Sequence, residues 1–420
     1  MASIFDLPDE ILAQILSYLT TSNLSNIFFV CKKSYELRNS PETWKTRKYT
    51  LRLEPHLIGR FTNLPNFRIL SLIFYGKEFP FDSLPSTITC LTLSGTINQK
   101  IDNLPPTLTH LTFGREFNQK VDNLPPTLTH LTFGRDFNQK VKKLPSTLKH
   151  LTFGCNFNQK VDNLPPSLTH LIFVDKFNQK VDNLPPSLTH LIFGVYSDFN
   201  QPVDNLPPSL TCLAFGAYSD FNQPVDNLPP SLTHLAFGYK FNHKVDNIPP
   251  SITHLNFCVY SEFNQSVDNL SPSLTHLTFG IEFNQKVDNL PSTLTHLTFG
   301  LGFNQKVENL PSSLTHLTFS REFNQKADNL PPSLTHLAFS HSFNQPVDNL
   351  PPSLTHLTFG YMFNQPLNNF PPSLTHLIFD FDFNQPVDNL PSTLTHLTLC
   401  HGFTHVVDHL VERGVKIKYE

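Results

Sequence analysis

The sequence predicts a small all-α unit at the N-terminus, followed by an all-β parallel β-solenoid of about sixteen repeats of 20–22 residues. Two observations predict the solenoid. The phrase Leu-Thr-His-Leu-Thr-Phe returns at a nearly constant step, and proline-rich segments separate its copies. A third observation predicts the helices, because apolar residues near the N-terminus recur at helical spacing.

Composition excludes several classes of protein before any motif is considered. The chain has 420 residues, a formal net charge of −4 and no basic run, so nucleic acid is not an expected partner. Neither a signal peptide nor a stretch of about 18 apolar residues is recognisable, so no membrane is expected. The six cysteines lack paired spacing, which favours an intracellular, reducing location over disulfides or a zinc site. We expect no metal and no cofactor.

The N-terminal unit is predicted to contain short helices. The run from Pro8 to Glu10 suits a first helical turn, and the apolar residues after it follow at helical spacing. A second helix is expected from Leu24 to Cys31, and Ser40–Glu42 opens a third element that holds Trp44. A unit of this size buries little apolar surface, so we expect it to keep an apolar face for a partner.

The order of residues from Leu7 to Lys45 resembles the F-box. The segment has the Leu-Pro opening, the Ile-Leu…Ile-Leu…Tyr-Leu helix, the Val-Cys-Lys step and the closing Trp-Lys. This resemblance implies docking onto the Skp-type adaptor of cullin–RING ubiquitin ligases. By matching positions, it assigns the adaptor contacts to Leu7, Pro8, Ile11, Leu12, Ile15, Leu16, Val30, Cys31 and Lys32, with Trp44 closing the motif. An ordinary helical cap on the repeats is the alternative.

The repeats give the rest of the domain organisation. We expect the F-box in residues 1–50, a transition and N-terminal capping repeat in 51–83, the solenoid in 84–399 and a C-terminal cap in 400–420. In the unit from Leu108 to Pro126, a short strand is predicted at Thr109–Phe113. Alternate residues of that strand face the core, and a further four apolar positions are Leu108, Phe117, Val121 and Leu124.

The tetrapeptides Phe-Asn-Gln-Lys and Phe-Asn-Gln-Pro, as at Phe343–Pro346, carry a second resemblance. They are similar to FNIP repeats, which are found in proteins of social amoebae and of giant viruses that infect amoebae. In such proteins an F-box followed by an array of this kind recurs, and the resemblance implies a leucine-rich-repeat-like fold and a place in the host cytoplasm. Gln replaces the isoleucine of the name here, at a loop position.

Two polar residues recur along the array. The asparagine after the core Phe, as at Asn118, is interpreted as structural, because it can bond loop backbone groups of neighbouring repeats. Histidine fills one slot in fourteen repeats. A row of identical slots specifies neither one metal site nor one catalytic histidine. We interpret it as the half-exposed face of a strand, with a partner-binding surface as the alternative.

Positions that depart from the repeat are the better candidates for a binding site. Three loops are two residues longer than the others, and each contains the motif Tyr-Ser-Asp or Tyr-Ser-Glu. Tyrosine is frequent at binding hot spots, so the candidate substrate-binding residues are Tyr196, Tyr218, Tyr260, His234 and His254. The alternative is that 22 residues is the usual length of this type of repeat, and that these three units have simply not lost the two residues that the other copies lack.

The two resemblances together imply a substrate-recruiting F-box subunit of a cullin–RING ubiquitin ligase, which binds a target protein through the solenoid. No enzymatic activity is expected in the chain itself. The alternative is a non-catalytic binding or decoy protein that occupies the Skp-type adaptor and delivers nothing. A glycan-processing enzyme would need clustered carboxylates on the sheet, whereas the repeated Asp lies in a loop.

Overall fold

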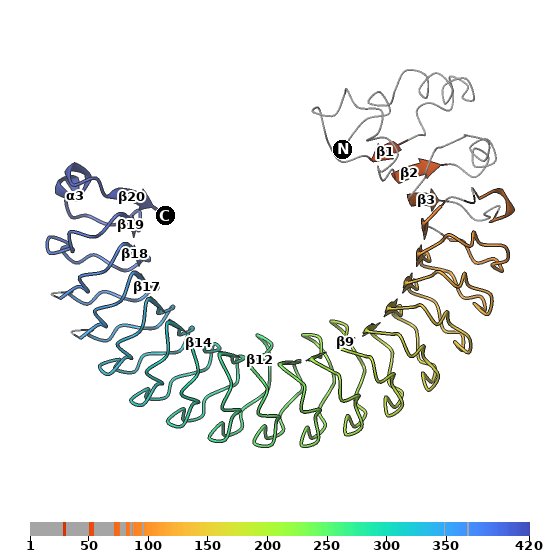
Figure 1. Cartoon of the computed structure of the whole chain (residues 1–420). Coiled ribbons are helices and arrows are strands. Elements are labelled where there is room, and N and C mark those ends of the chain that lie inside the picture. The colour runs from red at the N-terminus through yellow and green to blue at the C-terminus, as the bar shows by residue number, and fades with distance from the viewer. Residues whose placement is uncertain are drawn as a thin grey trace. The chain divides into compact units, whose positions relative to one another are not determined.

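The computed structural model describes residues 28–30, 50–53, 71–75 and 81–420, except residues 85, 87, 95, 348 and 368. The chain forms two compact units, Met1–Phe193 (unit 1) and Gly194–Glu420 (unit 2). In each unit, short strands and loops alternate along a coil, and one turn of that coil is called a rung below (Figure 1). The predicted parallel solenoid is therefore confirmed within each unit.

Unit 1 holds nine strands and one short 3-10 helix among its described residues. From β2 onward, each strand pairs in parallel with the next one along the chain. The elements are β1 Phe28–Val30, β2 Thr50–Leu53, β3 Ser71–Tyr75, η6 Phe81–Ser83, β4 Cys90–Ser94, β5 His110–Thr112, β6 His130–Thr132, β7 His150–Thr152, β8 His170–Phe173 and β9 His190–Phe193.

Unit 2 continues the same pattern through its last strand, and every described neighbouring pair is parallel. Its elements are β10 Cys212–Ala214, β11 His234–Phe237, β12 His254–Phe257, β13 His276–Thr278, β14 His296–Thr298, β15 His316–Thr318, β16 His336–Ala338, β17 His356–Phe359, β18 His376–Phe379, β19 His396–Leu399, α3 Asp408–Glu412 and β20 Lys416–Tyr419. The helix α3 buries Leu410 and lies just before the final strand.

The structure differs from the sequence prediction at one described place in the N-terminal segment. Residues Phe28–Val30, expected inside a helix, form strand β1 antiparallel to β2. Two aromatic residues and a β-branched valine favour a strand locally, and pairing with β2 supplies hydrogen bonds that a three-residue segment could not make alone. The remaining predicted F-box positions lie outside the described residues.

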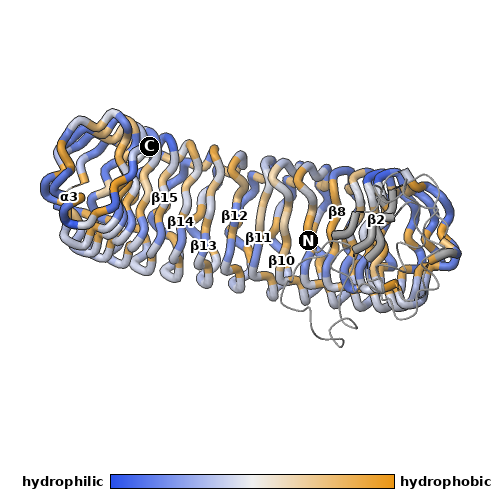
Figure 2. The backbone as a smooth tube through the Cα atoms, turned by 90° about the horizontal axis from the view of Figure 1, so that it is seen from above, coloured by the Kyte–Doolittle hydropathy of each residue, from blue (hydrophilic) through white to orange (hydrophobic). Residues whose placement is uncertain are grey.

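The core of each rung is made of the predicted apolar positions, with one correction. Leu108, Phe113, Phe117 and Val121 are buried as predicted, but Leu124 is only half-buried, because the loop leaves part of it in water. Phe113 and Phe117 stack within the rung at 3.9 Å between ring centroids. Each rung is too thin to shield these rings alone, so burial comes from the rungs on either side. Figure 2 shows the resulting alternation of apolar and polar residues along the coil.

The spacing of aromatic rings records the curvature of unit 2. Between two neighbouring rungs, the ring centroids of His276 and His296 lie 4.2 Å apart, on the face of the strands that points away from the core. The corresponding Phe rings lie 5.9 Å apart behind the strand and 6.1 Å apart at the loop. Because the rungs diverge toward the loops, the strands lie on the concave side of an arc (Figure 1). The histidines therefore line the concave face.

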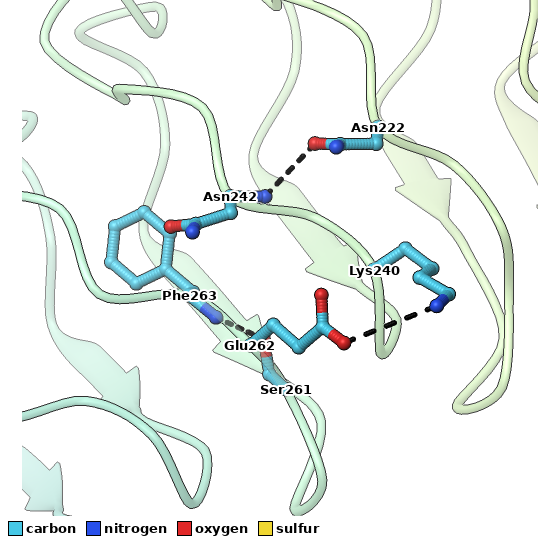
Figure 3. Close-up of polar contacts among 6 residues, drawn as sticks. All are labelled: Asn222, Lys240, Asn242, Ser261, Glu262 and Phe263. Carbon is cyan, nitrogen blue, oxygen red and sulfur yellow. Dashed lines mark hydrogen bonds and ion pairs between the residues drawn. The ribbon is translucent and has the colours of Figure 1, made fainter.

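The recurring asparagine forms a hydrogen-bonded ladder, as predicted. The Oδ1 atom of Asn284 accepts the backbone N–H of Asn304 at 2.9 Å and the amide of Gln305 at 3.2 Å. The same arrangement links Asn222 to the backbone of Asn242 (Figure 3). Each asparagine thus satisfies loop groups of the next rung, which explains its repetition without a ligand.

Candidate binding surface

Exposed apolar side chains of unit 2 gather in the short loops that follow the strands. We define the turn row as the residues between the two core Phe residues of each rung, such as those between Phe257 and Phe263. Most of the large apolar residues that unit 2 leaves exposed belong to it: Val195, Tyr196, Tyr218, Val259, Tyr260, Tyr361, Met362 and Phe381. In unit 1 from Phe113 onward the same positions read Gly-Arg-Glu, Gly-Arg-Asp, Gly-Cys-Asn and Val-Asp-Lys, and none of them holds an aromatic residue. The turn row of unit 2 is therefore an apolar surface of the kind that marks interaction sites.

The three predicted tyrosines come together in this turn row. The rings of Tyr196 and Tyr218 stack with centroids 5.3 Å apart, and those of Tyr218 and Tyr260 with centroids 5.6 Å apart. Tyr196 is 63% exposed and Tyr260 48%, so both ends of the stack face water. Rings that are already ordered by each other lose little conformational freedom on binding, which suits a contact surface.

In the Tyr-Ser-Asp and Tyr-Ser-Glu motifs, the serine is buried and the tyrosine is exposed. Ser197, Ser219 and Ser261 are buried, and each Oγ accepts the backbone N–H of the Phe two residues later at 3.2 Å. Figure 3 shows this contact between Ser261 and Phe263. The serine therefore shapes the longer turn, and the tyrosine before it is turned outward.

A shallow hollow of about 490 Å³ lies beside this stack. It is lined by Tyr239, Asn242, Tyr260, Glu262, Asn264, Ile281 and Glu282. At its edge the Lys240 ammonium lies 4.0 Å from the Glu262 carboxylate (Figure 3) and 4.8 Å from the centroid of the Tyr239 ring. A hydrogen bond to the Glu262 carboxylate, and its charge, raise the pKa of Tyr239.

A second aromatic row was missed by the sequence reasoning. His341, Tyr361 and Phe381 stack in consecutive rungs, with centroids 5.0 and 4.9 Å apart. The exposed Met362 lies next to them in the chain. The signal in the sequence is the run of three rings in consecutive turns, at a position that holds Arg115 and Arg135 in unit 1 and Arg321 one rung earlier.

The predicted histidines His234 and His254 belong to a separate ladder on the concave face. Their rings stack at 4.3 Å, and neither lines the hollow beside the tyrosines. The ladder continues through unit 2 to His396, with centroids 4.2 to 4.4 Å apart. Unit 1 has a similar ladder from His110 to His190. The five candidate residues thus divide between two surfaces.

The hydrogen bonds of the ladder define which ring nitrogen carries the proton. The Thr295 hydroxyl lies 3.1 Å from the Thr275 carbonyl oxygen, to which it donates, because a carbonyl cannot donate. The same hydroxyl oxygen lies 2.9 Å from Nδ1 of His296. Having only one proton, the hydroxyl must accept in this second contact, so Nδ1 of His296 is the protonated nitrogen.

The same contact of threonine with the following histidine recurs along the ladder. Nε2 is then the nitrogen with a free lone pair. That of His296 has no partner among the described residues and is not buried. The concave face of unit 2 is therefore a row of hydrogen-bond acceptors at neutral pH.

Burial lowers the pKa of nine ladder histidines, and the positive charge of neighbouring histidines lowers it further. Loss of water around each ring is the larger cause, and repulsion between protonated rings is the smaller one. Close stacking explains this order, because each ring covers part of the next one. The neutral form is therefore the favoured one.

The ladder does not have the geometry of a metal site. The rings of His276 and His296 are within 11° of parallel, so their Nε2 lone pairs point side by side rather than toward one ion. Among the described residues, no group of three or more His, Cys, Asp or Glu side chains could hold a metal ion.

Coiled parallel strands with an exposed apolar surface are typical of a protein-interaction scaffold of the leucine-rich-repeat-like kind. The family comparison is specific: the FNIP Repeat family matches residues 74–259 and 263–401 in overlapping copies, and an F-box-like domain matches residues 4–49. The chain belongs to the FNIP repeat family and carries an F-box-like domain at its N-terminus. This confirms both resemblances. No curated protein matches the chain.

One solved structure supports the fold, and a second is a less similar chain. A crystal structure of CroV588, described as a circular LRR protein, is 40% identical, with a TM-score of 0.67. The match covers 85% of this chain and 67% of that one. YopM from Yersinia enterocolitica is 21% identical with a TM-score of 0.49, over 84% of this chain and 82% of that one. In the described part of the chain, no helix is long and apolar enough to cross a membrane.

Proposed function

We propose that this protein is a substrate-recruiting subunit of a cullin–RING ubiquitin ligase. The single observation that supports this best is the F-box-like match at residues 4–49 in the same chain as a solenoid with an exposed aromatic surface. The F-box-like domain would bind a Skp-type adaptor inside the cell, and unit 2 would bind the target. The chain itself would catalyse nothing, since ubiquitin is transferred by enzymes elsewhere on such a complex.

The adaptor contacts proposed for the N-terminal domain are the apolar residues Leu7, Pro8, Ile11, Leu12, Ile15 and Leu16, with Val30, Cys31, Lys32 and Trp44. Apolar anchors at the centre of an interface contribute most of its affinity. Changing Leu7 and Pro8 together to Ala should therefore abolish binding of the full-length chain to a purified Skp-type adaptor, as measured by calorimetry. An affinity that is unchanged in the double variant would overturn this assignment.

The target side of the proposal rests on the tyrosine stack of unit 2. Replacing Tyr196, Tyr218 and Tyr260 by Ser should remove targets captured from cells while the adaptor is retained. A control is the replacement of Tyr419 by Ser, an exposed tyrosine in strand β20 that lies outside the turn row. Adaptor binding with no captured protein lost in the triple variant would favour the decoy alternative.

A further inference from the structure

The hollow beside Tyr260 exists because a short turn lies between two long ones. The turns that carry Tyr218 and Tyr260 each have two residues more than the intervening turn at Tyr239. The rings of Tyr218 and Tyr260 still meet, at 5.6 Å, although one rung separates them. Residues 260–262 also fall between two matches of the repeat family. This place is therefore a local departure from the repeated pattern.

Two carboxylates from neighbouring rungs face this hollow. The backbone N–H of Glu282 bonds the carbonyl of Ser261 at 3.4 Å, which places Glu262 and Glu282 on adjacent rungs. Both line the hollow, and both lie close enough to Tyr239 for their charges to raise its pKa. Glu262 is paired with Lys240, whereas Glu282 has no ion pair among the described residues. The hollow therefore has one carboxylate in excess.

The position of Lys240 shows that a cation is favourable at the edge of this hollow. The ammonium of Lys240 lies against the Tyr239 ring and the Glu262 carboxylate at the same time. A cation above an aromatic face and beside a carboxylate is stabilised by both. The lining of the hollow contains the same kinds of group a second time, in the Tyr260 ring, the apolar Ile281 and Glu282, which has no ion pair among the described residues.

We propose that this hollow binds an arginine side chain from an extended segment of a partner protein. The proposal rests on the proposed function, in which unit 2 binds the target, and it specifies the chemistry of that target. Arginine fits better than lysine, because a planar guanidinium can stack on Tyr260 while it donates to Glu282. An acidic segment would meet the excess carboxylate and be repelled.

The test uses the full-length chain and two peptides, fluorescein-Ser-Leu-Arg-Leu-Ser-amide, labelled at its N-terminus, and the same labelled peptide with citrulline in place of arginine. Citrulline keeps the planar shape of the side chain and removes its charge. In fluorescence polarisation at low ionic strength, the arginine peptide should bind about fivefold more tightly than the citrulline peptide. The preference should shrink at high salt, because the carboxylates are exposed.

Matched variants separate the hollow from general attraction to acidic loops. Glu282→Gln and Tyr260→Ala should each remove most of the preference for arginine. Glu322→Gln should leave it unchanged, since Glu322 holds the equivalent turn position two rungs away and lines no part of the hollow. Circular dichroism checks that each variant stays folded.

Equal binding of the two peptides, no binding of either at millimolar concentration, or equal loss in Glu322→Gln would each overturn the proposal. These outcomes differ from a failure of the proposed function. If Skp-type adaptor binding persists without a preference for arginine, only the inference fails. If the preference for arginine is found but no Skp-type adaptor binds, the arginine-binding inference is supported and the proposed ligase function is wrong.

Discussion

At the residue scale, the most specific result is the protonation state of the histidine ladder. Free imidazole in water exchanges between two neutral forms, whereas here the threonine hydroxyl accepts from Nδ1. We expect nitrogen NMR at pH 7.5 to show protonated Nδ1 and unprotonated Nε2 at every ladder histidine of unit 2, since each follows a threonine. Thr295→Val, which removes the acceptor beside His296, should restore exchange at that ring alone. A protonated Nε2 in the intact ladder would contradict the assignment.

The lowered pKa values of the ladder predict a direction for stability against pH. The unfolded chain takes up protons near the ordinary histidine pKa of about 6.5, whereas the folded rings resist protonation to lower pH. Below about pH 6.5 the unfolded state thus binds more protons, and stability falls as pH drops. The melting temperature should be lower at pH 5.5 than at pH 7.5.

Replacing alternate rings tests the source of that pH dependence. His296→Gln, His336→Gln and His376→Gln together remove three alternate rings whose pKa is lowered and uncover their neighbours, so the difference in melting temperature should shrink. Gln at His401, which lies outside the ladder, is the control. A difference that persists in full in the triple variant would assign the effect to carboxylates instead.

At the element scale, stability comes from rungs that shield each other. Phe283 is fully buried and stacks on Phe279 at 3.6 Å, between Phe263 and Phe303 of the adjoining rungs. Phe283→Ala should lower the free energy of unfolding by about 3 to 5 kcal/mol, because the cavity is left in a core that cannot collapse around it. Chemical denaturation measures the loss.

The exposed Phe381 is the matched control for this change. It is 62% exposed in the turn row, so Phe381→Ala should cost less than about 1 kcal/mol. Since each rung contacts only its neighbours, amide exchange in Phe283→Ala should rise mainly in the rungs beside it. A uniform rise across unit 2 would contradict this local coupling.

At the scale of the whole molecule, the features that could be predicted from the sequence are those that every repeat shares. The period located the strands, the buried faces and the asparagine ladder, because a feature present in every copy needs one explanation only. The repeat period could not reveal the hollow. It depends on a short turn between two longer ones, whose tyrosine rings still stack on each other. The repeat period also hid the row at Tyr361 and Phe381, where the length is constant and only side chains change.

The N-terminal segment had to be recognised in a different way. Its helices could be predicted only from spacing and from resemblance, since nothing in it repeats. The family match at residues 4–49 supports the resemblance, whereas β1 at Phe28–Val30 shows that local β-preference prevailed over the expected helix. Short segments without tertiary context are where such predictions are weakest.

The central claim is that one chain carries two independent binding surfaces, and one measurement tests it most directly. Quantitative affinity purification from cells would compare the wild-type chain, Leu7→Ala/Pro8→Ala, and Tyr196→Ser/Tyr218→Ser/Tyr260→Ser. The first variant should lose the Skp-type adaptor and cullin but keep its targets, and the second should keep the adaptor but lose the targets. Loss of both sets in either variant, or of neither in both, would contradict the claim.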